Sequence, residues 1–201
     1  MALQNRVLPT GEIVAAPWRG GMMGNRGCLH DGENRLQTAR WRHKNWVACL
    51  LEFRGRWREV MPKPGAPTVY TALFFWDEAA AFAAGHRPCG ECRNADYRRF
   101  RALWEDAGLP SGGAGAIDRE LHTHRVRRDR SQVRIRAATE DLPVGTFVLA
   151  AGPALIGPEG PLAWTPEGYR PTTLPGEVDV LTPAPILDVF RQGYRPVMRL
   201  P

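Results

Sequence analysis

Lysine is nearly missing from this chain of 201 residues, and so are long apolar segments. Of the 27 basic residues, only Lys44 and Lys63 are lysines, and the remainder are arginines. No apolar run approaches the roughly 18 residues that a membrane-spanning helix needs, which excludes a transmembrane protein. The first residues also lack an apolar stretch followed by a small-residue cleavage site, so we expect a cytoplasmic protein.

Several common catalytic signatures are missing as well. The sequence contains no phosphate-binding loop, no dinucleotide-binding glycine fingerprint, no nucleophile elbow and no H-E-x-x-H motif. We therefore do not expect nucleotide hydrolysis, nicotinamide redox chemistry or common metalloprotease chemistry.

The charge is distributed unevenly along the chain. Residues 1–136 carry 23 basic and 14 acidic residues, a net charge of +9, whereas residues 137–201 carry 4 and 7, a net charge of −3. The planar guanidinium of arginine grips phosphate with two parallel hydrogen bonds. The positive charge of residues 1–136 therefore indicates a polyanionic partner, and we expect DNA, in single-stranded or damaged form. A high-GC coding bias, which also favours arginine, is the alternative explanation.

The alternation of short strands and helices predicts an α+β fold. We expect residues 1–110 to form a zinc-tied unit of β-hairpin and helices, and residues 116–201 to form a smaller β-rich part. The glycine-rich run between them is the best internal boundary. The expected strands are 12–16, 46–53 with a return at 57–61, 69–76, 133–137, 147–150, 162–164 and 178–181, and the expected helices are 78–84, 95–107 and 117–130.

The sharpest motif is the C-x2-C turn formed by Cys89 and Cys92. Such a turn places two sulfurs on one side of a tight loop, and a structural zinc ion needs four ligands. The other two cysteines are Cys28 and Cys49, so one zinc ion held by all four is the economical expectation. Two alternatives stay open, namely a metal-free thiol pair and a histidine in place of Cys28. The candidate histidines are His30, His43 and His86.

The run FFWDEAAAFAAGHRPCGEC, from Phe74 to Cys92, resembles the C-terminal half of the Ada-type zinc domain. That family has a strand, a short alanine-rich helix and an A-A-G-[FY]-R-P-C-x-x-C signature. It binds DNA and repairs methylphosphotriesters through a zinc-bound thiolate. The resemblance covers residues 74–93 and implies that Cys89 and Cys92 are zinc ligands. The family's C-x3-C pair, which holds the methyl acceptor, has no counterpart here, so the acceptor role carries over to no residue.

Arginine and tryptophan are interleaved over residues 35–58, and more arginines follow Cys92. Arginine binds phosphates, and aromatic faces stack on exposed bases, so this pattern indicates a nucleic-acid surface. The alternative is a tryptophan-rich core with solvated arginines around it. The expected nucleic-acid-binding residues are Arg40, Arg42, Arg54, Arg56, Arg58, Trp57, Arg93 and Arg98.

Titratable groups are densest between Asp118 and Arg125. We expect His122 to be catalytic or to contact substrate, with Asp118 or Glu120 orienting its imidazole. Arg125 would then hold a phosphate or a developing negative charge. An array of salt bridges along a helix is the alternative.

Taken together, these features predict a DNA-binding zinc protein that acts in DNA repair. Its enzymatic form would process a lesion or a phosphodiester, as a glycosylase, lyase or nuclease does. A non-catalytic zinc adaptor that binds nucleic acid or protein is a second hypothesis, and a small-molecule enzyme with a structural zinc ion is a third.

Overall fold

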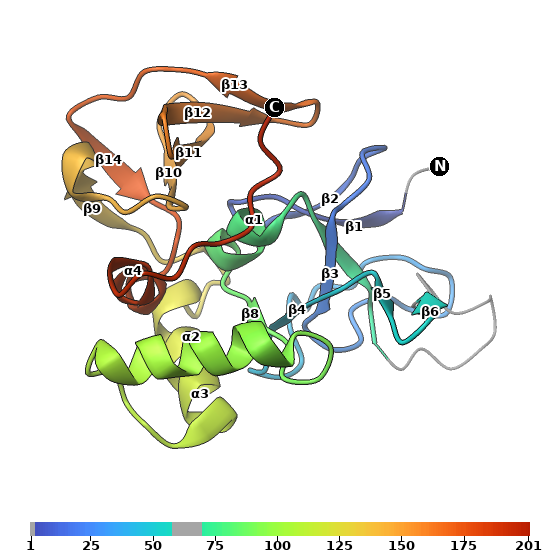
Figure 1. The fold of residues 1–201 in the computed structure, drawn as a ribbon. Coiled ribbons are helices and arrows are strands. Elements are labelled where there is room, and N and C mark those ends of the chain that lie inside the picture. The colour runs from blue at the N-terminus through green and yellow to red at the C-terminus, as the bar shows by residue number, and fades with distance from the viewer. Residues whose placement is uncertain (1–2, 58–69) are drawn as a thin grey trace.

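The computed structural model describes residues 3–57 and 70–201 (Figure 1). This part of the chain contains two six-stranded sheets, a two-stranded hairpin and four α-helices. The predicted α+β class is confirmed. None of the helices found here has both the length and the apolar character to cross a bilayer.

The first sheet has the strand order β2-β1-β7-β3-β4-β8. The β1–β7 and β4–β8 pairs are parallel, and the other neighbours are antiparallel. Sequence patterning missed β3 because glycines interrupt it. Gly24 is needed there, since a Cβ would stand 2.2 Å from the carbonyl oxygen of Val47. The strands are β1 (Gln4–Val7), β2 (Ile13–Ala15), β3 (Met22–Asn25), β4 (Val47–Cys49), β7 (Leu73–Phe75) and β8 (Arg87–Pro88).

The predicted long hairpin is much shorter in the structure. Residues 47–49 pair with β3 and β8 of the first sheet, and only β5 (Glu52–Phe53) and β6 (Arg56–Trp57) form a hairpin. Its turn uses left-handed backbone at Arg54 and Gly55, with φ angles of 55° and 72°. The expected return at 58–61 lies outside the described residues.

The second sheet is antiparallel throughout, with the order β13-β12-β11-β10-β14-β9. Strands expected at 133–137, 147–150, 162–164 and 178–181 are present, and two further strands, β11 and β13, complete the sheet. The strands are β9 (Ile135–Ala138), β10 (Phe147–Leu149), β11 (Pro153–Gly157), β12 (Gly160–Thr165), β13 (Gly168–Pro171) and β14 (Glu177–Val180), with a 3-10 turn at Thr139–Asp141.

Four helices pack beside the two sheets (Figure 1). Helix α1 (Glu78–Ala83) matches the helix expected at 78–84, and its N-cap is Asp77, whose Oδ1 accepts a hydrogen bond from the Ala80 amide at 2.9 Å. Helix α2 (Asn94–Asp106) matches the helix expected at 95–107. Helix α3 (Gly113–Arg125) overlaps the helix expected at 117–130 but begins inside the glycine-rich run and ends at Arg125, and α4 (Ala184–Arg191) was not expected. One buried cluster joins all four helices, and it contains Phe82, Phe100, Trp104, Leu121, Ile186, Phe190 and Tyr194.

Two acidic residues at the start of α1, Asp77 and Glu78, hold the C-terminal segment in place through hydrogen bonds. Glu78 is 1% exposed, and its Oε1 accepts from the hydroxyl of Tyr194 at 2.7 Å. Its Oε2 accepts from the amide of Val197 at 2.8 Å. Asp77 likewise accepts from the hydroxyl of Tyr169 at 2.7 Å. The segments before and after residue 110 are therefore connected through buried polar contacts as well as through the core.

Candidate functional site

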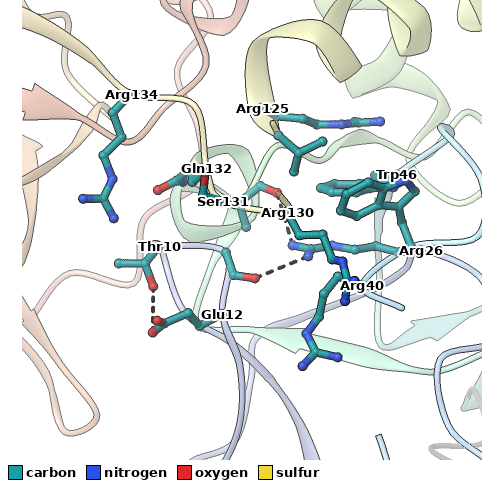
Figure 2. A pocket seen from close by; sticks show the side chains of 14 residues that line it. Thr10, Glu12, Arg26, Arg40, Trp46, Arg125, Arg130, Ser131, Gln132 and Arg134 are labelled. Carbon is teal, nitrogen blue, oxygen red and sulfur yellow. Dashed lines mark hydrogen bonds between the residues drawn. The ribbon is translucent and has the colours of Figure 1, made fainter. Parts of the chain in front are cut away.

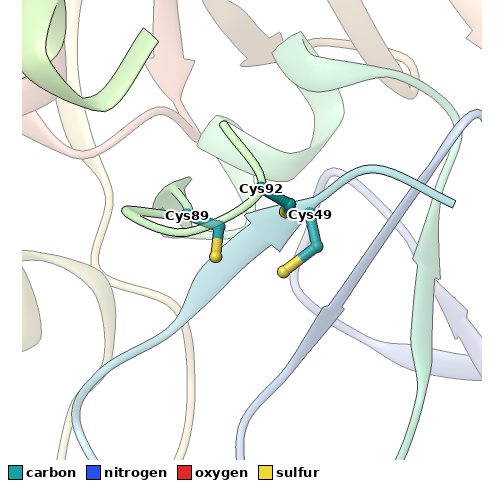
Figure 3. A group of neighbouring side chains, drawn as sticks. All are labelled: Cys49, Cys89 and Cys92. Atoms are coloured by element: carbon teal, nitrogen blue, oxygen red, sulfur yellow. The ribbon is translucent and has the colours of Figure 1, made fainter. Parts of the chain in front are cut away.

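Three cysteines meet where two parallel strands end (Figure 3). Cys49 is the last residue of β4, Cys89 follows β8, and Cys92 lies in the turn after it. The amide of Cys89 donates to the carbonyl oxygen of Ala48 at 3.0 Å, which continues the pairing of the two strands. The three sulfur atoms all lie within 4.8 Å of one another, so this cluster could hold a metal ion.

The surroundings of the cluster favour a thiolate at Cys89, whereas contacts with Cys89 raise the pKa values of Cys49 and Cys92. Hydrogen bonds from the Cys49 and Cys92 thiols lower the pKa of Cys89, and the backbone amides of Cys92 and Glu91 add to this effect. A tetrahedral zinc site with sulfur ligands at about 2.3 Å needs sulfur atoms about 3.8 Å apart, which is compatible with three sulfur atoms that all lie within 4.8 Å of one another. Three of the four ligands of a tetrahedral thiolate site are thus present. Such soft ligands favour zinc, copper(I) or iron–sulfur centres.

Cys28 does not join this cluster. Its Sγ lies 3.6 Å from the carbonyl oxygen of His30, on the loop after β3. The His30 ring is itself held by Thr71 at 3.0 Å and by the backbone of Gln4 at 3.1 Å. Within residues 3–57 and 70–201, no fourth cysteine, histidine or carboxylate completes the group. Among residues 58–69, Glu59 is the one residue of these types.

A second candidate site is a cavity of about 290 Å³ whose charged lining residues are mostly arginines (Figure 2). It lies between the β1–β2 turn, the loop that precedes β4 and the segment that follows α3. Five arginines face a single carboxylate among its lining residues. They are Arg26, Arg40, Arg125, Arg130 and Arg134, and the carboxylate is Glu12. This excess of positive charge favours an anionic ligand.

Arg26 forms the buried floor of this arginine pocket. It is 3% exposed, and its guanidinium carbon lies 4.1 Å from the ring centre of Trp46. Its N–H groups donate to the carbonyl oxygens of Gly11 and Ala84, both at 3.3 Å, and to His86 Nε2 at 3.5 Å. No carboxylate of the described chain lies within ion-pair distance of it. Burial lowers the pKa of Arg26 to about 9, so the group remains charged at neutral pH.

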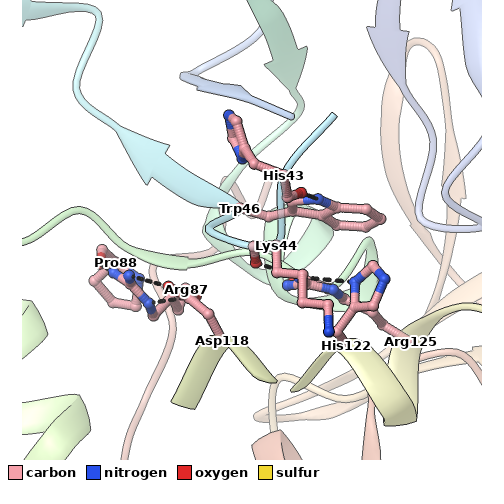
Figure 4. A network of polar contacts seen from close by, with 9 residues as sticks. His43, Lys44, Trp46, Arg87, Pro88, Asp118, His122 and Arg125 are labelled. Carbon is pink, nitrogen blue, oxygen red and sulfur yellow. Dashed lines mark hydrogen bonds and ion pairs between the residues drawn. The ribbon is translucent and has the colours of Figure 1, made fainter. Parts of the chain in front are cut away.

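Arg125 lies on Trp46 as well, 4.0 Å from its ring centre, so the indole contacts two guanidiniums (Figure 4). Arg125 is 2% exposed and donates to the carbonyl oxygens of Gly85, at 2.7 Å, and Lys44. Its Nε has no hydrogen-bond partner among the described residues. Burial lowers the pKa of Arg125 to about 9.

The two carboxylates expected to orient His122, those of Asp118 and Glu120, form hydrogen bonds with other side chains. Asp118 accepts two hydrogen bonds from Arg87, and Glu120 Oε1 lies 3.0 Å from His124 Nε2. Asp118 and His122 do share a helix, as expected, but Arg87 occupies both carboxylate oxygens (Figure 4). The structure therefore does not form the predicted histidine–carboxylate pair.

His122 instead stands edge-on to two tryptophans. Its ring centre is 5.5 Å from that of Trp41 and 6.0 Å from that of Trp46. Its Nδ1 accepts from Arg125 at 3.3 Å. Burial, with Arg125 and Lys44 nearby, lowers the pKa of His122 to about 4, so the imidazole is neutral at neutral pH.

The residues expected to bind nucleic acid are scattered. Arg40 lines the arginine pocket, while Arg42 is exposed beside it and donates to the carbonyl oxygen of Cys28 at 3.3 Å. Arg54 and Arg98 are exposed on the hairpin and on α2. They do not line the arginine pocket.

Arg93 is buried, in contrast, and its Nη2 lies 2.6 Å from Glu78 and 2.8 Å from Asp96. Its charge is therefore balanced inside the core. The remaining expected residues are not described in full, because the side chains of Arg56 and Trp57 and the whole of Arg58 lie outside the described part.

Sequence reasoning missed Arg26, Arg130 and Arg134. A signal for the last two was present, because residues 125–136 contain six arginines. Arg26 gave no signal, since it stands alone in a glycine-rich stretch that was expected to be an irregular loop.

Comparison with known proteins gives no relative from which a role could be transferred. The chain matches no protein-family model, no curated protein and no solved structure.

Proposed function

We propose that this protein is a zinc-containing DNA-binding protein that acts in DNA repair in the cytoplasm. The arginine pocket carries the proposal, because five arginines face one glutamate there and the innermost has no carboxylate partner in the described chain. Protein sites with such an excess of guanidinium groups bind phosphate-rich polymers.

The aromatic residues of the pocket support nucleic acid over other polyanions. Trp41 and Trp46 both line the cavity, and Trp41 is half-buried, so part of its ring stays accessible. Arginine beside an accessible indole is typical of surfaces that bind single-stranded nucleic acid, where bases stack and phosphates pair with guanidiniums.

The metal proposed for the cysteine cluster is zinc, held by Cys49, Cys89 and Cys92. When bound, zinc would supply a structural cross-link between β4 and the turn that follows β8. Helix α2 begins at Asn94, two residues after Cys92, so the metal would also fix the start of that helix. The sequence resemblance to the Ada-type domain supports the same metal and the same class of partner.

The test is DNA affinity measured over a range of salt concentrations. If guanidiniums of the pocket contact phosphates, log affinity falls linearly with log salt, and each arginine removed lowers the slope by about one. We expect Arg130→Glu combined with Arg134→Glu to weaken binding of all DNA sequences by about tenfold or more. Arg170→Glu, an exposed arginine on β13, is the matched control and should change affinity by less than about twofold.

Affinity that does not change with salt or with reversal of Arg130 and Arg134 would contradict the proposed function.

A further inference from the structure

The floor of the arginine pocket contains a positive charge that the described chain does not neutralise. Arg26 makes three hydrogen bonds, all to neutral acceptors and all at 3.3–3.5 Å. Guanidinium carries five N–H groups, so two are left for another partner. Removing a charge from water without an opposite charge is costly, and buried charges in proteins are normally paired.

The inner end of the pocket is closed by protein. Trp46, Ala84 and Gln132 line it together with Arg26. Trp46 is 1% exposed, and the Gln132 amide donates to three backbone carbonyls, those of Pro9, Ala83 and Leu181, at 3.0–3.2 Å. A ligand can therefore reach Arg26 only from the open side of the cavity, which suits a group at the end of a ligand.

The rim adds further cations that face the same space (Figure 2). Arg130 sits in a tight turn with a left-handed backbone, φ 73°, which is unusual for a residue with a side chain. Its Nη1 donates to the carbonyl oxygen of Thr38 at 2.8 Å, and this contact fixes the Arg130 side chain at the opening of the cavity. Arg134 is exposed and lines the cavity too, on the other side of Gln132 from Arg130 in Figure 2. The cations thus approach the cavity from its floor and from its rim.

We infer that the arginine pocket binds a phosphomonoester, the terminal phosphate of a DNA strand. A phosphomonoester carries nearly two negative charges at neutral pH and three acceptor oxygens, whereas a phosphodiester within a strand carries one charge. Arg26 would contact the phosphate from the floor, and Arg130 and Arg134 would contact it from the rim. That the phosphate belongs to DNA rests on the proposed function, whereas the phosphate site itself does not.

The experiment compares one short single-stranded oligonucleotide in three forms, with a 5′-phosphate, with a 3′-phosphate and with neither. Binding is followed by fluorescence anisotropy, and inorganic phosphate is the competitor. We expect one phosphorylated form to bind about tenfold more tightly than the unphosphorylated form. Inorganic phosphate should remove that difference.

Arg130→Gln combined with Arg134→Gln tests the site without disturbing the buried floor. We expect this variant to lose the preference for the phosphorylated form while its melting temperature stays unchanged. Arg170→Gln, on β13, should retain the preference.

The outcomes separate the two proposals. Equal binding of all three forms, with no effect of inorganic phosphate, overturns the terminal-phosphate site and leaves DNA binding intact. Binding of inorganic phosphate in calorimetry, without binding of any oligonucleotide, supports the phosphate site and overturns DNA binding. A preference that survives in the Arg130/Arg134 variant would also overturn the proposed site.

Discussion

Arg87 and Asp118 form a buried ion pair with two parallel hydrogen bonds. Arg87 Nε donates to Oδ1 at 2.9 Å and Nη2 to Oδ2 at 2.7 Å, and neither side chain is more than 6% exposed. Because Arg87 stands two residues before Cys89, this pair connects the cysteine turn to α3. Helix α3, which comes after the cysteines in the sequence, therefore holds the strand that leads into the candidate metal centre.

Replacing Asp118 by Asn should destabilise the fold strongly. The change leaves the Arg87 guanidinium buried without a counter-charge, which costs about 3–5 kcal/mol in comparable pairs. Thermal or urea unfolding measures the loss. Asp188→Asn is the control, since its pair with Arg191 is exposed and contributes at most about 1 kcal/mol. Equal stability of the two variants would show that the buried pair is dispensable.

Metal content should distinguish the clustered cysteines from Cys28. We expect about one equivalent of zinc in the purified protein, and loss of that zinc in Cys49→Ser, because a hydroxyl is a poor substitute for a thiolate. Cys28→Ser should retain the metal, because the Cys28 sulfur lies apart from the cluster. Elemental analysis of both variants provides the measurement. Zinc lost from Cys28→Ser but kept in Cys49→Ser would contradict the assignment.

Stability should fall as the pH drops from about 6.5 to about 4, in part because of His122. Its pKa is lowered to about 4 in the folded protein, so the unfolded chain takes up the proton at higher pH. The stabilisation is therefore complete above the unfolded pKa and is lost on acidification. His122→Gln should show a smaller decrease in melting temperature between about pH 7.5 and about pH 5. An identical decrease in both proteins would contradict the half-buried, neutral imidazole.

Tyr194→Phe should lower the free energy of unfolding by about 1–3 kcal/mol. The substitution removes the hydroxyl that donates to Glu78 Oε1 and leaves Arg93 as the remaining donor to that buried oxygen. Chemical denaturation gives the difference. Tyr97→Phe is the control, because that side chain is only half-buried on α2 and should change stability much less. A similar loss in both variants would mean that the Glu78 contact adds little.

Local signals predicted much of the scaffold. The alanine-rich segment at 78–84 predicted α1, and the C-x2-C spacing predicted the paired thiols. These features depend on a few consecutive residues, so the sequence displays them directly. The hairpin was wrong in its extent because β4 pairs across the first sheet with β3 and β8, and such pairing depends on segments distant in sequence.

The candidate pocket could not be predicted in the same way. Arg26 is an ordinary arginine in the sequence, and its importance comes from burial against Trp46 and from the carbonyls of Gly11 and Ala84. Asp118 and His122 have helical spacing that favours contact, yet the Asp118 carboxylate pairs with Arg87 instead. Competition between partners for one side chain appears only once the fold is known.

The fastening of the C-terminal segment has a consequence for the order of folding during translation. Glu78 and Asp77 accept backbone hydrogen bonds from Val197 and Arg199, at 2.8 and 3.0 Å. Until the ribosome has released those residues, the two carboxylates at the head of α1 lack these donors. The N-terminal sheet can begin to form during synthesis, but this part of the interior closes only after translation has passed Arg199. In a nascent chain that stalls before that point, the carboxylates of Asp77 and Glu78 would remain exposed to the solvent.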